Sequence, residues 1–223
     1  MHGQAGAQRG LRFVVLFPMN KGCAKFEEHG RVCDFGTRAW APSVAFDGER
    51  WIMLYGPDRL RAAVCDDARL DHWREAPCSL VGAPLEAVLR DGMIFRLDHD
   101  SWLLYATGKR GRCGTVSVCV SENLLDWRFV RHALVTTPEA PSNVSWAATE
   151  SPFVFRHAGA YWLSITYTKS FGGPGEYHNT LLFRSENPFD FRSFTNSRRR
   201  ICSLLLMSCF STPISSRMAF CFA

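Results

Sequence analysis

The sequence predicts an all-β protein, a β-propeller of four-stranded antiparallel blades, and three observations lead to this fold class. First, a hairpin pattern of apolar strand, polar turn and second strand headed by an aromatic residue occurs three times. Second, a bend motif follows each hairpin, always in the same order. Third, helical periodicity longer than two turns is hard to find between residues 11 and 195. A four-stranded unit that recurs every ~45–60 residues is the sequence signature of propeller blades.

The hairpin pattern occupies residues 42–55, 92–105 and 152–165, so its copies begin 50 and 60 residues apart. Each turn is made of residue types that tolerate hairpin dihedrals. The three turns are Asp47-Gly48, Asp98-His99-Asp100 and Ala158-Gly159. The aromatic residues that head the second strands are Trp51, Trp102 and Tyr161. Each copy therefore predicts the first two strands of one blade.

The bend motif supplies the rest of each blade. Its copies AVCDDARLDHW, VCVSENLLDW and LFRSENPFDF end at Trp73, Trp127 and Phe191, and an earlier copy survives around Phe26 in KFEEHGRV. The successive intervals between Phe26, Trp73, Trp127 and Phe191 are 47, 54 and 64 residues. A β-sandwich with accidental internal resemblance is the alternative. Two independent motifs that keep one order argue against it.

These motifs divide the chain into three parts. Residues 26–195 are expected to form the blades, residues 1–25 a remnant of a first blade or irregular structure, and residues 196–223 a separate tail. We expect about three to four blades, with the propeller incomplete at both ends. The tail has six Ser, three Cys, four Arg and no acidic residue. Such a shift is typical of an out-of-frame translation or a truncated gene model, and a genuine basic tail is the alternative.

Charge and composition exclude several classes of protein. Without the four arginines of the tail, 22 basic residues stand against 21 acidic ones, so no global basic field suggests nucleic acid. The nine cysteines form no CxxC pair, which favours reduced, unpaired thiols over a zinc site. The N-terminus lacks the apolar core of a signal peptide, and the apolar run at 201–210 is too short to span a bilayer. We therefore expect a soluble protein without membrane contact. The sequence does not determine its compartment, although it slightly favours the cytoplasm.

The candidate chemistry lies where the first strand of each blade opens onto the central channel. The three openings read Trp40-Ala41-Pro42, Arg90-Asp91-Gly92 and Glu150-Ser151-Pro152. Two successive blades thus aim a carboxylate, Asp91 and Glu150, at the axis. A charge at the threshold of a buried strand is costly unless it is paired or used. Two carboxylates in an aromatic-rimmed funnel suggest acid–base chemistry on a glycosidic bond, with one kept protonated by burial and a neighbouring like charge.

Several of these stretches resemble the five-bladed propellers of glycoside hydrolase families 43 and 32. The segment WAPSV at 40–44 is similar to the family 43 opening of the second blade. The pair RD at 90–91 resembles the RDP motif, with Gly92 where the family has Pro. The segment TESPFVF at 149–155 resembles the glutamate motif, and SENLLDW at 121–127 the recurrent bend. The likeness covers roughly residues 20–195.

The resemblance implies a role for each matching residue. Glu150 is expected to be the general acid. Asp91 is expected to tune the pKa of that acid and hold the sugar ring, or to stabilise the oxocarbenium-like transition state, and Arg90 to hydrogen-bond a sugar hydroxyl. The third acid of the family, a nucleophile or base on the first blade, has no match, because residues 1–25 contain no Asp or Glu. Asp34, in VCDFG, is the nearest candidate.

Three further residues are candidates for binding substrate. Trp40 and Trp146 flank the openings and could stack on sugar faces, although a buried aromatic is the commoner fate of Trp. His178, after the Gly-rich loop FGGPGEYH, could reach the funnel, although a solvated loop histidine is the alternative. Glu150 could equally be a surface residue, and Asp91-Gly92 an ordinary turn pair.

The sequence therefore predicts a glycosidase for O-glycosidic bonds in arabinose-, xylose- or fructose-containing saccharides. Its partner is an oligo- or polysaccharide, and we expect no cofactor and no metal. The alternative is a catalytically incomplete carbohydrate-binding propeller or a fragment. Retention or inversion stays open, because it depends on whether ~5–5.5 Å or ~6.5–9.5 Å separates the two reacting carboxylates.

Overall fold

The computed structural model describes residues 11–18, 24–35, 40–56, 59–67, 69–84, 89–138, 149–167, 179–192 and 219–220. Every regular element in these ranges is a β-strand, and no α-helix is assigned to them. The strands are β1 (Leu11–Pro18), β2 (Ala24–Cys33), β3 (Ser43–Phe46), β4 (Trp51–Tyr55), β5 (Arg61–Cys65), β6 (Arg74–Ala76), β7 (Ser79–Val81), β8 (Arg90–Arg96), β9 (Trp102–Arg110), β10 (Cys113–Ser121), β11 (Asp126–Pro138), β12 (Thr149–His157), β13 (Ala160–Tyr167), β14 (Asn179–Ser185) and β15 (Ala219–Phe220).

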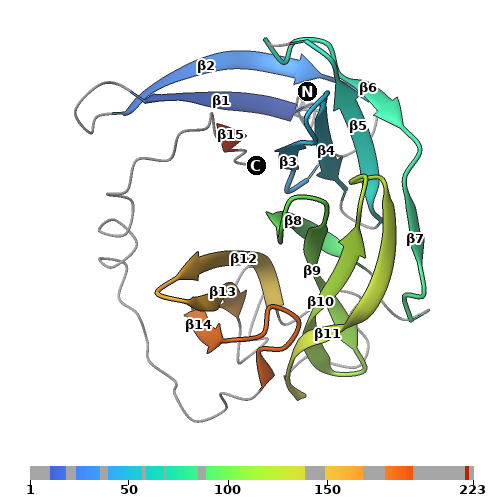
Figure 1. Cartoon of the computed structure of the whole chain (residues 1–223), viewed down its shortest axis with the longest axis vertical. Coiled ribbons are helices and arrows are strands. Elements are labelled where there is room, and N and C mark those ends of the chain that lie inside the picture. The colour runs from blue at the N-terminus through green and yellow to red at the C-terminus, as the bar shows by residue number, and fades with distance from the viewer. Residues whose placement is uncertain are drawn as a thin grey trace, which may run out of the picture.

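These strands form four sheets, in the orders β15-β1-β2, β3-β4-β5-β6, β7-β11-β10-β9-β8 and β12-β13-β14. All neighbours pair antiparallel except β7, which runs parallel to β11 along the outer edge of its sheet. Figure 1 shows the sheets as successive sectors around a centre, with β3, β8 and β12 innermost. The predicted all-β propeller architecture is confirmed.

The three predicted hairpins form where the turn residues indicated. In the turn between β3 and β4, the Asp47 carboxylate accepts hydrogen bonds from the N–H groups of Glu49 and Arg50, both at 2.8 Å. In the turn between β12 and β13, Ala158 and Gly159 have φ of 48° and 74°. Two successive residues with positive φ match the right-handed twist of the flanking strands, which is why short hairpins favour them.

Two of the three complete copies of the bend motif share one hydrogen bond and one backbone conformation. The indole N–H groups of Trp73 and Trp127 donate to the carbonyls of Leu70 and Leu124, at 2.9 and 3.0 Å. Both leucines have positive φ, 63° and 64°. The third copy has Pro188 at the matching position, and the proline ring does not permit that φ. The bend of the β12–β14 sheet therefore has a different backbone conformation, although the spacing of its residues is the same.

The hydrophobic core lies between successive sheets. One cluster, which includes Ile52, Leu104 and Trp127, joins the β3–β6 sheet to the β8–β11 sheet. A second cluster, which includes Tyr105 and Leu163, joins β8–β11 to β12–β14. Strands β9 and β10 contribute to both clusters, so their side chains are buried on both faces. This explains their nearly continuous apolar sequence.

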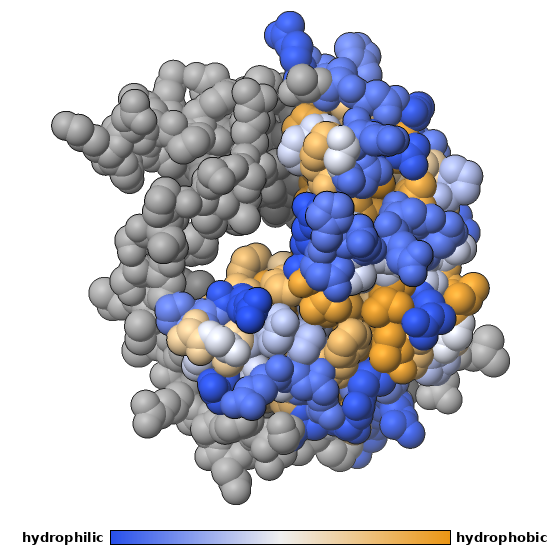
Figure 2. All heavy atoms as spheres, in the orientation of Figure 1, coloured by the Kyte–Doolittle hydropathy of each residue, from blue (hydrophilic) through white to orange (hydrophobic). Residues whose placement is uncertain are grey.

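The innermost strands touch one another around the centre. The Ser43 hydroxyl of β3 accepts a hydrogen bond from the Ile94 N–H of β8 at 3.0 Å. The ring of Phe95 on β8 meets that of Tyr161 on β13 edge-on, with centroids 6.0 Å apart. In the same orientation, Figure 2 shows a hollow at the centre when all heavy atoms are drawn. Strands β3, β8 and β12 therefore border a shared space.

Strands β1, β2 and β15 lie in or next to the two terminal parts of the chain that the sequence analysis placed outside the complete blades. Phe26 lies near the start of β2, which pairs with β1. Strand β15 pairs with β1 through Val14 and Val15. The division at residues 25 and 195 stays a prediction. No helix in the described ranges is both long and apolar enough to cross a membrane, and Cys65, Cys78, Cys113 and Cys119 carry free thiols.

Candidate active site at the inner strand openings

The openings of β8 and β12 share one backbone irregularity. On β8, the three-residue step from Arg90 to Met93 lies opposite a two-residue step on β9. On β12, the step from Glu150 to Phe153 lies opposite a two-residue step on β13. Each is a β-bulge, a device that bends a strand and re-aims its side chains and that is enriched next to active sites.

The opening of β3 has the same irregularity. The Trp40 carbonyl accepts a hydrogen bond from the Gly56 N–H at 3.2 Å, and Ser43 pairs with Leu54. Three residues again lie opposite two. The shared bulge makes Trp40 the structural counterpart of Arg90 and of Glu150, since each begins the bulged step.

The residue inside each bulge has a left-handed backbone. The φ angles are 42° for Ala41, 53° for Asp91 and 49° for Ser151. This region costs an L-residue other than glycine roughly 1–2 kcal/mol, and the surrounding sheet must maintain it. The three openings read from the sequence already have this alignment, and what the sequence did not reveal is the left-handed backbone that they share. The structure aligns Asp91 with Ser151 and Arg90 with Glu150.

Arg90 and Glu150, 60 residues apart in sequence, form an ion pair across adjacent openings. The distance from Arg90 Nη2 to Glu150 Oε1 is 2.6 Å, and the side chains are 12% and 26% exposed. A short, charge-assisted hydrogen bond of this kind compensates for taking both groups partly out of water. The structure thus brings together two residues that the sequence proposed separately, one for acid–base chemistry and one for binding.

Asp91 lies within electrostatic range of this pair. Burial raises the pKa of Asp91, and the charge of Glu150 raises it further, whereas Arg90 and the N–H of Ser151 act in the opposite direction. The net effect is a raised pKa. The opening therefore holds two carboxylates in unlike environments, one ion-paired and one that retains its proton more readily than a solvated Asp.

A buried threonine cluster anchors the β12 opening to the neighbouring sheet. Thr107 lies opposite Arg90 in the β8–β9 ladder, and its hydroxyl donates to the Thr149 carbonyl. The two hydroxyls are 2.7 Å apart, and that of Thr149 donates to the Thr115 carbonyl at 3.1 Å. Sequence reasoning missed these residues. The available signal was a set of β-branched polar residues in otherwise apolar strands, one directly before Glu150.

The remaining predicted site residues are placed as follows. Trp40 is 41% exposed at the third opening, so its side chain is not buried in the core. Asp34 is exposed and follows β2, and the ring of Phe35 stacks on that of Tyr55, with centroids 5.4 Å apart. Asp34 thus lies beside the β3–β6 sheet, not on either strand that carries Asp91 and Glu150. Trp146 and His178 lie outside the described residues.

The described part of the chain contains no group of three or more His, Cys, Asp or Glu side chains placed to hold a metal ion. The chemistry that the site offers there is that of two carboxylates, a guanidinium and an exposed indole. This set can donate and accept protons and can hold a hydroxylated ligand.

Sheets packed face to face around a centre, with their first strands innermost, define the chain as a β-propeller. Comparison with solved structures finds propeller glycoside hydrolases of families 32 and 43 among those it resembles. The family 32 β-fructofuranosidase of Bombyx mori, solved with sucrose, superposes with a TM-score of 0.59 at 14% identity over 79% of this chain. A family 43 enzyme of Xanthomonas citri gives 0.55 at 19% identity over 80%.

A third similar structure is the exo-β-1,3-galactanase of Phanerochaete chrysosporium, solved with β-1,3-galactotriose, with a TM-score of 0.51 at 17% identity over 74% of this chain. The chain spans 41%, 63% and 39% of the lengths of these three proteins, in the order given. Neither protein-family models nor curated protein sequences gave a match. The similarity is therefore one of fold.

Proposed function

We propose that the chain is a glycoside hydrolase-like protein whose inner strand openings act on O-glycosidic bonds. The observation that carries this proposal is the 2.6 Å pair of Arg90 and Glu150, formed across adjacent openings with Asp91 beside it. The fold shared with propeller glycoside hydrolases supports the same reading. Two carboxylates in unlike environments are what acid–base cleavage of a glycosidic bond requires.

Glu150 acts as the general acid, and Arg90 controls when it does so. While Arg90 holds Glu150, the carboxylate is occupied by the guanidinium. A sugar hydroxyl that accepts the hydrogen bond of Arg90 opens the pair. Glu150 then takes up a proton from solvent and donates it to the glycosidic oxygen as the bond from that oxygen to the sugar carbon breaks. Asp91 supplies the nearby carboxyl that tunes this exchange and interacts with the charge that develops on the sugar ring.

The substrates proposed are arabinose-, xylose- or fructose-containing saccharides. The similar structures were solved with sucrose, xylotriose and β-1,3-galactotriose, which supports a saccharide of this general kind. Trp40 is exposed at the opening of β3 and offers an indole face for a sugar ring. Trp146 and His178 are proposed as further binding residues, and Asp34 as a weak candidate for the nucleophile or base.

The test compares Glu150→Gln with the control Glu122→Gln, which changes an exposed glutamate of the bend before β11. Sugar release is measured for sucrose, xylotriose and the nitrophenyl glycosides of arabinose and xylose. For poor leaving groups, Glu150→Gln should lower the rate about 10²–10⁴-fold, the usual contribution of a general acid, while substrate still binds. Nitrophenyl substrates should lose less, because nitrophenolate needs little protonation. Unchanged activity in Glu150→Gln would refute the assignment.

A carbohydrate-binding propeller that cleaves nothing is the second candidate. The observation that favours it is the β3 opening, where Trp40 and Ala41 stand at the positions that carry Arg90 and Asp91 on β8. The wild-type chain should then bind one of these saccharides saturably and release no sugar at high protein concentration.

A further inference from the structure

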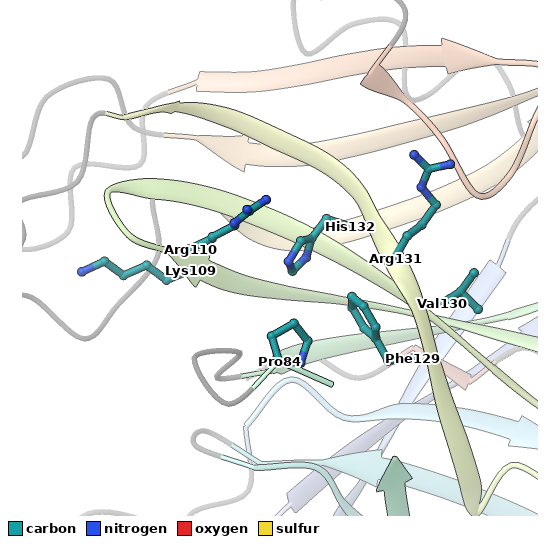
Figure 3. Close-up of a pocket in the computed structure, with 7 residues that line it drawn as sticks. All are labelled: Pro84, Lys109, Arg110, Phe129, Val130, Arg131 and His132. Atoms are coloured by element: carbon teal, nitrogen blue, oxygen red, sulfur yellow. The ribbon is translucent and has the colours of Figure 1, made fainter. Parts of the chain in front are cut away.

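A cavity of about 430 Å³ lies on the β8–β11 sheet, apart from the Arg90–Glu150 pair. Its walls come from the end of β9, from the middle of β11 and from Pro84, which follows β7 (Figure 3). A volume of this size is within the range of pockets that hold small ligands, about 300–1,000 Å³. We call it the Arg110 pocket.

An irregularity in β11 explains why its side chains converge there. Cys119 lies opposite Phe129 and Ser117 opposite His132, so two residues of β10 span three residues of β11. Phe129 and His132 therefore leave β11 on the same side, the side that packs toward the β3–β6 sheet. Figure 3 shows Arg110, His132 and Phe129 turned toward one another.

The charged groups that line the pocket are all cationic. Arg110 contributes its positive charge from β9, whereas the Lys109 side chain extends away from the pocket in Figure 3, and no acidic residue is among the lining residues that the structure describes. Arg131 also lines the pocket but extends away from its centre in Figure 3 and pairs with Asp190 at 3.3 Å. Burial lowers the pKa of His132, and the positive charge of Arg110 lowers it further. The interior thus has a positive potential that an anion complements.

The pocket also offers apolar surface. The Phe129 ring meets the His132 ring edge-on with centroids 5.3 Å apart, and Pro84 stands across from them. The His132 ring is held by a hydrogen bond of 3.1 Å between its Nδ1 and the Ser117 hydroxyl. A flat aromatic wall beside a guanidinium suits a ring that carries a carboxylate, because Arg binds carboxylates in a fork geometry.

The pocket lies at the same end of the sheet as the candidate active site. Arg90 is opposite Thr107, and Lys109 and Arg110 follow Thr107 on β9 by two and three residues. At the usual rise per residue, this is ~7–10 Å along the strand, and β11 lies three strands, ~14 Å, from β8. A saccharide chain can therefore occupy both places at once.

We propose that the Arg110 pocket binds a uronate, a sugar unit that carries a carboxylate, so that the protein selects acidic saccharides. The choice of a saccharide rests on the function proposed above. The carboxylate lies against Arg110, and the sugar ring packs on Phe129. The pocket thereby adds charge selection to the sugar recognition of the inner openings.

The test uses glucuronate and glucose, which differ at C6 by the carboxylate alone. Binding to the wild-type chain is followed by ligand-observed NMR at low and high salt, and compared with Arg110→Gln. Arg112→Gln is the matched control, because Arg112 is exposed on the same β9–β10 turn and is not a lining residue. We expect glucuronate to bind at least tenfold more tightly than glucose, more weakly at high salt, and at least fivefold more weakly to Arg110→Gln. Arg112→Gln should match wild type.

Equal binding of glucose and glucuronate would overturn the proposal, as would an equal loss in both arginine variants. Inorganic phosphate that binds as tightly as glucuronate would overturn the assignment to a saccharide. Glu150→Gln separates this proposal from the previous one, because it should slow sugar release from poor leaving groups and leave glucuronate binding unchanged. Hydrolysis of neutral saccharides without uronate binding refutes the pocket alone, and uronate binding without hydrolysis refutes the glycosidase alone.

Discussion

The opening of β3 and the openings of β8 and β12 have the same backbone and different chemistry. All three carry the same bulge, and the residue inside it has a φ between 42° and 53°. At the first position of the bulge, β3 presents an exposed Trp40, whereas β8 and β12 present the two halves of an ion pair. The two charged openings hold each other through this pair, whereas the β3 opening presents an indole.

This difference indicates that the bulge is a property of the blade, and that the side chain aimed by it is free to vary. Ala41 has no polar group that benefits from a left-handed backbone, yet it adopts the same φ as Asp91 and Ser151. Sheet pairing on both sides of the bulge must therefore impose this backbone. Such a scaffold can exchange an indole for a carboxylate without refolding, which suits a site assembled from several blades.

The largest expected effect on stability comes from breaking the Arg90–Glu150 ion pair, which the opening of β3 lacks. Arg90→Met leaves Glu150 partly buried without its partner and should lower the free energy of unfolding by about 2–3 kcal/mol, somewhat below the cost for a fully buried pair. Arg74→Met is the matched control, because Arg74 and Asp66 are also 2.6 Å apart but 56% and 60% exposed. It should cost less than about 1 kcal/mol. Urea denaturation measures both, and equal losses would contradict a special role for burial.

An intermediate effect tests whether the three bulges are equivalent. Ala41→Gly and Ser151→Gly remove the steric cost of a positive φ, and each should raise the free energy of unfolding by about 0.5–1 kcal/mol. Ala45→Gly is the control on the same hairpin. Ala45 lies in the regular part of β3, so its replacement should lower stability by a similar amount. If Ala41→Gly and Ala45→Gly shift the thermal midpoint in the same direction, the bulge is not strained.

The smallest expected effect is the pH dependence that Asp91 adds to the β8 opening. Because its pKa is raised above the unfolded value of 3.8, the folded state holds this proton more tightly than the unfolded state. Stability from Asp91 is therefore fully present below pH 3.8 and is lost as pH rises through the folded pKa. Asp91→Asn should be more stable than wild type at pH 7, with the difference shrinking toward pH 3.5.

Asp126→Asn provides a control of opposite sign. Hydrogen bonds from Asn123 and Ser79 lower the pKa of Asp126, so its contribution is present at neutral pH and is lost as pH falls. Denaturant midpoints of both variants at pH 3.5, 5 and 7 test the pair. Parallel pH profiles for the two substitutions would show that Asp91 is not held in the environment described.

The hairpins and bends were predictable from sequence because their determinants are local. Asp47 beside Gly48 specifies one turn, and Gly159 another, because glycine adopts a positive φ at little cost and Asp accepts hydrogen bonds from the backbone of the turn. The aromatic residue of the bend motif recurs at Phe26, Trp73, Trp127 and Phe191. Its spacing indicates the length of a blade, since each blade must complete its strands before the next begins. The left-handed φ of Ala41 and Ser151 was not predictable, because neither residue type favours it.

The amino-acid sequence by itself determined the strands, the turns, the order of the blades and the candidacy of Asp91 and Glu150. Only the tertiary structure decided that Arg90 and Glu150, which stand at matching positions of their openings, are bonded to each other. It also decided that Thr107 and Thr149 anchor that opening, and that Arg110 meets His132 in a pocket. The physical reason is distance along the chain: strand and turn preferences act over a few residues, whereas these contacts join residues 22 to 60 positions apart and exist only once the sheets pack.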